Sequence, residues 1–359
     1  MSKYRQKSQE INYICSIIVQ KNMNLNGIIK RIFLTIPVAA AMLTALTGCD
    51  SNKWRSAEGA VWATSYHITY HGSKELHDSI IAVMKDVEMS LSPFNEASAI
   101  SRLNRGETDS VDAMFIRVFT VSQQVCRASG GLYDPTVAPL VNLWGFGYKK
   151  TGIEPDSSAV DSCRSLVDIA SCRIEGSRLV RGKEGMEFDF SSITKGMGCD
   201  MVGEMLVRNG VTDYMVEIGG EMALRGRNPH GEDWHVMIDA PKDAPSVPSG
   251  RIALIGITDC GVATSGNYRN YKLTPSGRVW HSISPVTGRP AITTVLSATV
   301  IAPTAMEADA LATACMVMEP KAALAMVESM EGAEALLIAD NGKGGYRFVS
   351  TEGFPEIMK

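Results

Sequence analysis

The pattern of apolar and polar positions along the chain predicts helices and strands that alternate in no fixed order. Apolar residues recur at helical spacing in four stretches, which lie at 76–91, 115–128, 195–209 and 306–318. Shorter apolar or alternating runs are typical of strands and lie at 61–70, 185–190, 214–218, 234–239, 251–257 and 295–301. Because these elements follow no strict β-α-β repeat, the pattern favours an α+β fold with mixed sheets and interleaved helices.

The first apolar stretch, residues 32–46, differs from the others in what flanks it. Lys30 and Arg31 precede it, and Leu46-Thr47-Gly48-Cys49 ends it. A membrane-spanning helix needs roughly 20 residues, whereas this stretch has the length of the apolar region of a signal peptide. A small-residue pair followed by cysteine resembles the bacterial lipobox, in which that cysteine becomes the lipidated first residue of the mature protein. An ordinary signal peptide or an N-terminal anchor is the alternative.

These features predict three segments: a signal peptide over 1–48, a lipidated tether over 49–58 and a folded unit over 59–359. Met23 begins a well-proportioned signal peptide, so we expect translation to start there. Lipidation of Cys49 would anchor the protein to a membrane of the bacterial cell envelope, facing the periplasm or the exterior.

The composition of the chain is ordinary for a globular protein, with 45% hydrophobic and 21% charged residues and a net charge of −4. Because there is no basic cluster, we expect no nucleic-acid binding. The cysteines after Cys49 are scattered and show no metal-binding spacing. Cys163 and Cys172 flank one short segment and could form a disulfide; buried free thiols are the alternative that we favour.

The C-terminal part of the chain carries a pattern that favours phosphate chemistry. His281 opens a loop rich in proline and glycine that ends at Pro290. In the predicted helix 306–318, Asp309 and Thr313 are four residues apart and therefore share one face. A carboxylate and a hydroxyl on one face can hold a hard cation, beside a histidine that can accept a proton. A lone histidine is more often structural, so this interpretation depends on the other clusters.

Five further clusters combine polar or aromatic residues with glycine or proline, and each also has a structural explanation. Residues 130–136 place an acid and a hydroxyl in a rigid turn, where the acid could bind a ligand or cap a helix. Residues 189–196 join a predicted strand to a helix start, where free N–H groups suit an anion. The remaining clusters, which also fit core packing, a tight hairpin and a strand connection, lie at 144–147, 219–221 and 264–269.

Taken together and in this order, the clusters resemble the ApbE family, the FAD:protein FMN transferases. The resemblance runs from about residue 62 to about residue 318. Its landmarks lie at 92–95, 98–104, 131–136, 139–140, 144–147, 189–196, 219–221, 264–266, 281–290 and 308–313. The resemblance implies an ApbE-like, two-lobed catalytic unit, and many members of the family are exported and lipid-anchored.

The resemblance also implies roles for individual residues. Asp309 and Thr313 match side-chain ligands of Mg²⁺, and Ser192 matches a ligand that acts through its backbone carbonyl. His281 matches the histidine that deprotonates the acceptor hydroxyl. The positions that match FAD contacts are Trp62, Phe94, Leu132, Tyr133, Asp134, Asp189, Lys195 and Ile283.

The implied reaction is Mg²⁺-dependent transfer of the FMN moiety of FAD to a Thr or Ser hydroxyl of an acceptor flavoprotein, with release of AMP. A subunit of a membrane redox complex is one candidate acceptor. An FAD pyrophosphatase that gives FMN and AMP, and a non-enzymatic FAD-binding lipoprotein, are the alternatives. Three positions depart from the family pattern: Trp62 stands where methionine is usual, Ser284 where aspartate is frequent, and Ala312 where some relatives carry a carboxylate.

Overall fold

The computed structural model describes residues 52–149, 155–239, 251–266, 271–274, 277–343 and 345–358. The predicted signal peptide, the start at Met23 and the lipidation site at Cys49 lie outside these residues. Residues 53–58, which the predicted tether includes, belong to a strand.

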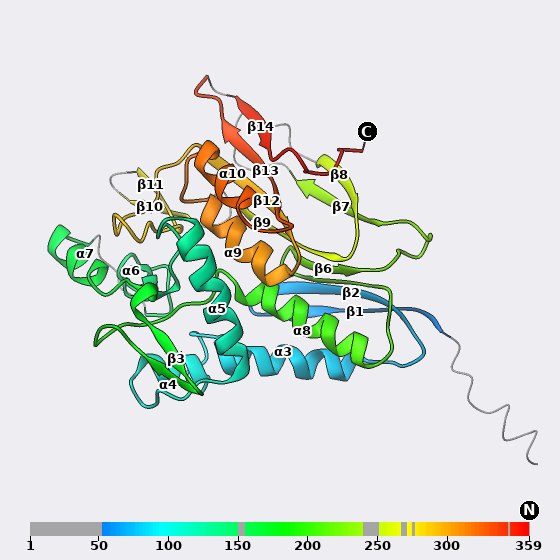
Figure 1. The fold of residues 1–359 in the computed structure, drawn as a ribbon, viewed down its shortest axis with the longest axis horizontal. Helices are drawn as coiled ribbons and strands as arrows, with labels where there is room; N and C mark the ends of the chain where they lie inside the picture. Colours follow the sequence, from blue (N-terminus) through cyan, green and yellow to red (C-terminus); the bar gives the residue numbers. More distant parts are fainter. Residues whose placement is uncertain are drawn as a thin grey trace, which may run out of the picture. The chain divides into compact units, whose positions relative to one another are not determined.

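One eight-stranded sheet forms the centre of the fold (Figure 1). Its strands follow the order β1 (Lys53–Val61), β2 (Thr64–Gly72), β5 (Tyr214–Ile218), β6 (Glu221–Arg225), β9 (Cys260–Gly266), β12 (Val295–Ala302), β13 (Glu334–Asp340) and β14 (Tyr346–Ser350). The sequence pattern predicted mixed sheets, whereas all neighbouring strands in this described sheet are antiparallel. The α+β class itself is confirmed. A long insertion between β2 and β5 supplies much of the helical structure.

One face of the sheet is covered by helices. Helix α8 (Thr194–Arg208) packs against α3 (His77–Leu91) and α9 (Ala305–Cys315), and α5 (Ala113–Ala128) packs against α9 (Figure 1). Side chains alternate between the two faces along each strand. In β12, for example, Val300 joins the core beneath the helices, whereas Ile301 joins a second core on the opposite face. The hairpin of β7 (Trp234–Asp239) and β8 (Arg251–Ile257) contributes to that second core.

Shorter elements surround the sheet and helices. They are α4 (Ala99–Asn104), η1 (Pro135–Val137), α6 (Ala138–Leu143), α7 (Ser157–Arg164), η2 (Ile169–Ser171), β3 (Arg173–Glu175), β4 (Arg178–Val180), β10 (Tyr271–Thr274), β11 (Gly277–Trp280) and α10 (Pro320–Glu328). Leu140, Val160 and Ile283 form a small separate core that joins α6 and α7 to the histidine loop. The two lobes that the family resemblance implies are not separate units, because Asn52–Lys359 forms one compact unit.

The structure differs from the predicted elements at two places. The predicted strand 61–70 is broken by Trp62 and Ala63, whose φ angles of 48° and 60° form the tight turn between β1 and β2. The predicted strand 185–190 has no ladder among the described residues. Its backbone donors bond elsewhere: Phe188 N–H donates to the side chain of Asn104, and Asp189 N–H donates to the carbonyl of Pro135. This segment is therefore a loop.

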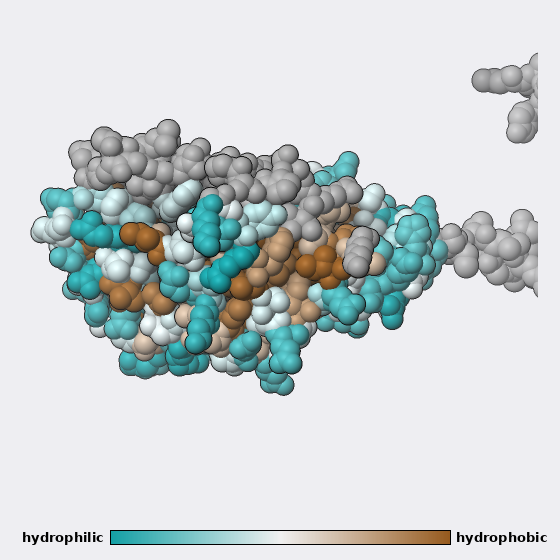
Figure 2. All heavy atoms as spheres, turned by 90° about the horizontal axis from the view of Figure 1, so that it is seen from above, coloured by the Kyte–Doolittle hydropathy of each residue, from teal (hydrophilic) through white to brown (hydrophobic). Residues whose placement is uncertain are grey.

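The surface mixes hydrophilic and hydrophobic residues, and apolar side chains gather near the middle of the face seen from above (Figure 2). Within the part of the chain that the structure describes, every helix is too short or too polar to cross a membrane. Cys163 and Cys172 are both free thiols, as favoured, although only Cys172 is fully buried. Burial raises the pKa of each thiol above its ordinary value.

Candidate active site

A cavity of about 680 Å³ lies where the helix layer, the sheet and the histidine loop meet. Eleven of the twelve residues predicted for catalysis, FAD contact and metal binding line it: His281, Phe94, Leu132, Tyr133, Asp134, Asp189, Lys195, Ile283, Ser192, Asp309 and Thr313. Other lining residues come from the clusters at 144–147, 219–221 and 264–266. The structure thus brings segments from very different parts of the sequence to one cavity.

Helix α9 positions the predicted metal ligands, and its first turn is held on two sides. Thr304 caps the helix, because its hydroxyl oxygen accepts the N–H of Glu307 at 3.2 Å. The carboxylate of Asp200, on α8, accepts the N–H groups of Ala305 and Met306 at 2.9 Å each. These bonds satisfy helix N–H groups that have no partner within the helix. The direction of α9, and hence the place of Asp309, depends on them.

Asp200 leads to a prediction on pH-dependent stability. Desolvation raises its pKa to about 7, against the opposing effect of the Met306 and Ala305 hydrogen bonds. An unfolded aspartate has a pKa of about 3.9, so the native state binds this proton more tightly and the unfolding free energy should fall from about pH 4 to about pH 7. Asp200→Asn should remove roughly 1–3 kcal/mol of that fall, as measured by urea unfolding across this range.

The control for this experiment is Glu204→Gln, which neutralises a partly exposed carboxylate on the same helix. The charge of Glu204 is the weakest of the effects on the pKa of Asp200, so the pH dependence of stability should change far less than in Asp200→Asn. A wild-type slope in the Asp200→Asn protein would contradict the prediction.

Asp309 and Thr313 lie on the face of α9 that lines the cavity, as the spacing predicted. Asp309 is only 1% exposed. Its Oδ2 atom accepts the N–H of Gly196 at 3.0 Å, and its Oδ1 atom lies 3.5 Å from Nζ of Lys195. The Thr313 hydroxyl lies 3.5 Å from the hydroxyl of Ser265. These oxygens give the cavity a buried anionic corner.

Lys195 bridges two buried carboxylates in this corner. Its Nζ atom lies 2.8 Å from Oε1 of Glu221, which is closer than its distance to Asp309. Desolvation by itself would lower the pKa of Lys195, but the charges of Asp309 and Glu221 outweigh it and raise the pKa above the ordinary value. Burial raises the pKa of Glu221, although the nearby ammonium opposes this. In the sequence, residues 219–221 stand out for their glycines, and no pattern there indicates the role of this glutamate.

Two further carboxylates line the cavity but already accept hydrogen bonds from within the protein. Asp134 accepts the N–H and hydroxyl of Thr136 through Oδ1, and the N–H of Ile169 through Oδ2. Asp189 accepts the N–H and hydroxyl of Ser191. Burial raises the pKa of both carboxyl groups, while these hydrogen bonds act in the opposite direction. The capping role considered for Asp134 is therefore real, and it coexists with a place in the cavity wall.

Tyr133 links two segments of the cavity wall, 130–136 and 189–196. The hydroxyl of Ser192 donates to its phenolic oxygen at 3.1 Å. Burial is the main cause that raises the pKa of Tyr133, so the phenol stays protonated at neutral pH. The Ser192 side chain is thus used within the protein, which leaves its backbone carbonyl as the group that the resemblance proposes as a metal ligand.

The histidine loop is fixed at its base by backbone hydrogen bonds. Ser284 N–H donates to the carbonyl of Arg289, and Gly288 N–H donates to the carbonyl of Ser284, both at 2.8 Å. The indole Nε1 of Trp144 donates to the Gly288 carbonyl at 2.9 Å and ties the loop to α6. His281 lines the cavity at the start of the loop. The centroid of its ring lies 6.5 Å from the centroid of the Phe146 ring.

The residues that line this cavity lie within a part of the sequence that matches a known family. A sequence model described as the ApbE family matches residues 62–337. The chain belongs to the ApbE family. It is 34% identical over 334 residues to an FAD:protein FMN transferase of Vibrio cholerae, covering 90% of this chain and 98% of the relative. It is 33% identical to an FAD:protein FMN transferase of Haemophilus influenzae, covering 85% of this chain and 93% of the relative.

Solved structures agree with this membership. Flavin Transferase ApbE from Vibrio cholerae matches with a TM-score of 0.75 and 31% identity, covering 85% of this chain and 99% of that chain. The apo form of flavinyl transferase ApbE from Pseudomonas stutzeri matches with a TM-score of 0.75 and 30% identity, covering 84% and 96%. The predicted family, the predicted α+β fold and the prediction of a transferase are confirmed.

Trp62 lies differently from the other predicted contacts of this ApbE-family chain, because it is not among the residues that line the cavity. Its left-handed backbone belongs to the β1–β2 turn, and its indole packs between two of the hydrophobic cores. A Cβ on Gly198 would lie 2.6 Å from Cη2 of the indole, so the ring is seated on α8 where only glycine leaves room. The structure thus gives Trp62 a packing role.

Ser284, the second departure from the family pattern, is buried within the histidine loop. Its hydroxyl oxygen accepts the N–H of Thr287 at 3.3 Å. It supports the turn from inside and is not among the residues that line the cavity.

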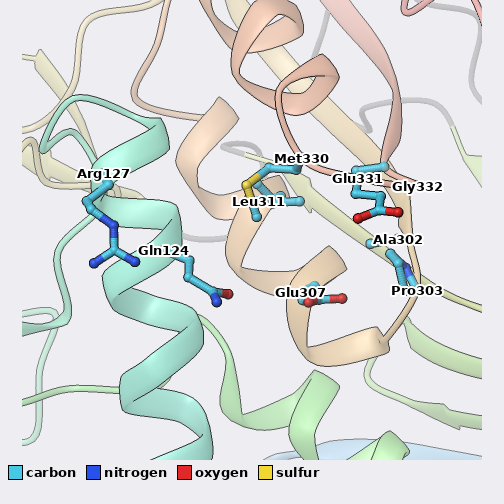
Figure 3. Close-up of a pocket in the computed structure, with 10 residues that line it drawn as sticks. Gln124, Arg127, Ala302, Pro303, Glu307, Leu311, Met330, Glu331 and Gly332 are labelled. Carbon is cyan, nitrogen blue, oxygen red and sulfur yellow. The ribbon is translucent and has the colours of Figure 1, made fainter.

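A second cavity, of about 630 Å³, lies on the other side of α9 (Figure 3). Glu307 and Leu311 face it, whereas Asp309 and Thr313 line the first cavity, because positions two apart lie on nearly opposite sides of a helix. Gln124 and Arg127 of α5 form its far wall (Figure 3). Helix α9 therefore separates two hollows, and the predicted ligands lie in only one of them.

Proposed function

We propose that this protein transfers the FMN moiety of FAD to a Thr or Ser hydroxyl of a partner protein, in a Mg²⁺-dependent reaction that releases AMP. The observation that carries the proposal is the convergence of His281, Lys195 and the Asp309–Thr313 pair on one cavity. The names of the relatives and the family membership support it. A histidine, a cation and hard oxygen ligands are the groups that a transfer from a diphosphate uses.

The oxygen atoms present fit Mg²⁺ better than a transition metal. Among the described residues, no group of three or more His, Cys, Asp and Glu side chains could hold a metal. Mg²⁺ needs only one or two protein carboxylates, since it retains water and binds substrate phosphates. Asp309, Thr313 and the Ser192 carbonyl are the groups that would hold it. When bound, Mg²⁺ would supply charge neutralisation for the diphosphate and for the AMP that leaves.

The cavity walls suit a flavin nucleotide. Apolar and aromatic side chains, including Phe146, Ile283 and Met316, share the lining with the charged corner. Phe94 is 64% exposed and still lines the cavity, so it lies at the mouth. Flat apolar rings bind to such walls, while a few polar groups set orientation. Lys195 provides the positive charge nearest to the place where a diphosphate would lie beside Asp309.

In the proposed step, the oxygen of the acceptor hydroxyl forms a bond to the phosphorus of the FMN moiety. The P–O bond that joins this phosphorus to the AMP portion breaks, and AMP leaves with that bridging oxygen. The hydroxyl proton passes to His281, which acts as general base. The rate then depends mainly on how well the hydroxyl oxygen is aligned with the bond that breaks.

The experiment that tests this function incubates the purified protein with FAD, Mg²⁺ and a candidate acceptor protein. Covalent flavin fluorescence in the acceptor band of a denaturing gel, together with AMP, is the expected result. AMP and free FMN without a labelled acceptor would instead indicate FAD hydrolysis. Bound but unchanged FAD would indicate a carrier protein.

We also propose that the protein is a lipoprotein of the cell envelope, anchored through Cys49 and facing the periplasm or the exterior. The support is the basic and apolar segment that ends in Leu46-Thr47-Gly48-Cys49. An anchored enzyme would meet acceptor proteins at the membrane, such as a subunit of a redox complex.

The anchor leads to a prediction. Cys49→Ser should block lipidation, because a serine hydroxyl cannot form the thioether link to the lipid. The variant should accumulate as unprocessed precursor or leave the membrane fraction, which fractionation and mass spectrometry would measure. An unchanged membrane fraction with a mature N-terminus at another residue would show that the signal peptide was misinterpreted.

A further inference from the structure

The charged corner of the cavity holds more negative than positive charge within the protein itself. Glu221 is 3% exposed and Asp309 is 1% exposed, and the ammonium of Lys195 is shared between them. Oε1 of Glu221 pairs with this ammonium, but Oε2, also buried, has no hydrogen-bond partner among the described residues. A buried carboxylate oxygen without a partner is costly unless a further positive charge or donor is provided.

We propose that Lys195 is the internal counter-ion of Asp309 when no dication is bound, and that Glu221 is the positioning residue that draws the ammonium away when a dication binds. This inference rests on the proposed function, since it concerns the same metal site. The distances support it, because Nζ is already 0.7 Å closer to Glu221 (2.8 Å) than to Asp309 (3.5 Å).

Lys195 can make this movement, whereas the two carboxylates are fixed. Asp309 is tied to Gly196 by a hydrogen bond, and Glu221 lies at the start of a central strand. The Lys195 side chain is 32% exposed, and a flexible stem carries its ammonium group. A Cβ on Gly219 would lie 3.3 Å from Cδ of Lys195, so the glycine turn before Glu221 gives the stem its space.

Electrostatics sets the direction of the movement. A dication held by Asp309 would repel the ammonium, which is within 4 Å of the same carboxylate. Glu221 offers the ammonium a second buried partner, so its charge is never left uncompensated. Without Glu221, Lys195 would pair with Asp309 alone and compete with the dication for it. Glu221 therefore favours metal binding through Lys195.

The test measures the affinity for Mn²⁺ alone, without FAD, by calorimetry on the full-length protein in detergent. Glu221→Gln should weaken Mn²⁺ binding by about tenfold or more, while the melting temperature shows that the protein is folded. Glu217→Gln is the matched control, because it removes a negative charge from the neighbouring strand. The Glu217 carboxylate accepts the Gly220 N–H and forms no ion pair with Lys195. The control variant should leave the affinity nearly unchanged.

A double-variant cycle separates positioning from a simple loss of negative charge. In a Lys195→Met background the competing ammonium is gone, so Glu221→Gln should have little further effect on Mn²⁺ affinity. A loss of Mn²⁺ affinity as large as in the native background, or larger, would overturn the proposal and show that Glu221 acts directly on the metal.

A crystal structure with Mn²⁺ provides a second readout that does not depend on these variants. It should show Lys195 Nζ still on Glu221 and more than 4 Å from Asp309. An ammonium that remains at its present distance from Asp309 beside bound Mn²⁺ would also overturn the proposal. The metal part of the proposed function fails as well if the wild type binds no Mn²⁺, or binds Mn²⁺ that Asp309→Asn does not remove. A wild type whose Mn²⁺ binding depends on Asp309 but not on Glu221 would contradict only the role of Glu221.

Discussion

Asp309→Asn is expected to abolish FMN transfer while the protein stays folded. The substitution removes the one carboxylate on the cavity face of α9, and with it the charge that would hold Mg²⁺. The amide oxygen can still accept the Gly196 N–H that Asp309 accepts at 3.0 Å. Transfer measured as covalent flavin fluorescence should fall to background, whereas the thermal unfolding midpoint should change little.

Asp309→Ala serves as a comparison for stability. It would leave the buried Gly196 N–H without an acceptor, at a cost of about 1–3 kcal/mol, so alanine is less neutral here than an exposed helix position would suggest. EDTA should also abolish transfer by the native protein, and excess Mg²⁺ should restore it. Undiminished transfer in EDTA would end the proposal that Asp309 and Thr313 hold an essential Mg²⁺.

The secondary structure was predictable where the hydrophobic pattern is strong. The strands Tyr214–Ile218 and Trp234–Asp239 are found at their predicted residues, because buried and less buried side chains alternate along both. The turn at Trp62 was not predictable from pattern, since two residues other than glycine adopt positive φ there. The segment 185–190 looks like a strand in sequence, but the N–H groups of Phe188 and Asp189 bond to a side chain and a loop carbonyl, which only the tertiary structure decides.

The candidate site was predictable to different degrees. Helical spacing alone placed Asp309 and Thr313 together, because positions four apart share a face. The partners in the other segments depended on the order of motifs and its resemblance to a family, since no local rule brings His281 to the same cavity. Glu221 was missed because its importance arises from one contact, with Lys195 on another element, and from a buried oxygen that no sequence pattern reveals.

His281→Ala should reduce the transfer rate by about 10²- to 10⁴-fold, the usual contribution of a general base. His281 lines the same cavity as Asp309, and the loop that follows it is held by backbone bonds and by the indole of Trp144, so truncation should not disturb the wall. FAD affinity should barely change, because the imidazole is proposed to act on the acceptor hydroxyl. Single-turnover rates and FAD titrations would measure the two quantities separately.

The matched control is His235→Ala, which truncates a histidine of β7 that does not line the cavity. It should leave both the rate and FAD affinity unchanged. In the native protein the rate should also fall as the pH is lowered, because a protonated imidazole cannot accept the hydroxyl proton, and this limb of the pH profile should be absent from the residual activity of His281→Ala. A variant with normal turnover and weakened FAD binding would instead make His281 a contact of the nucleotide, and the base would then have to be another group in the cavity.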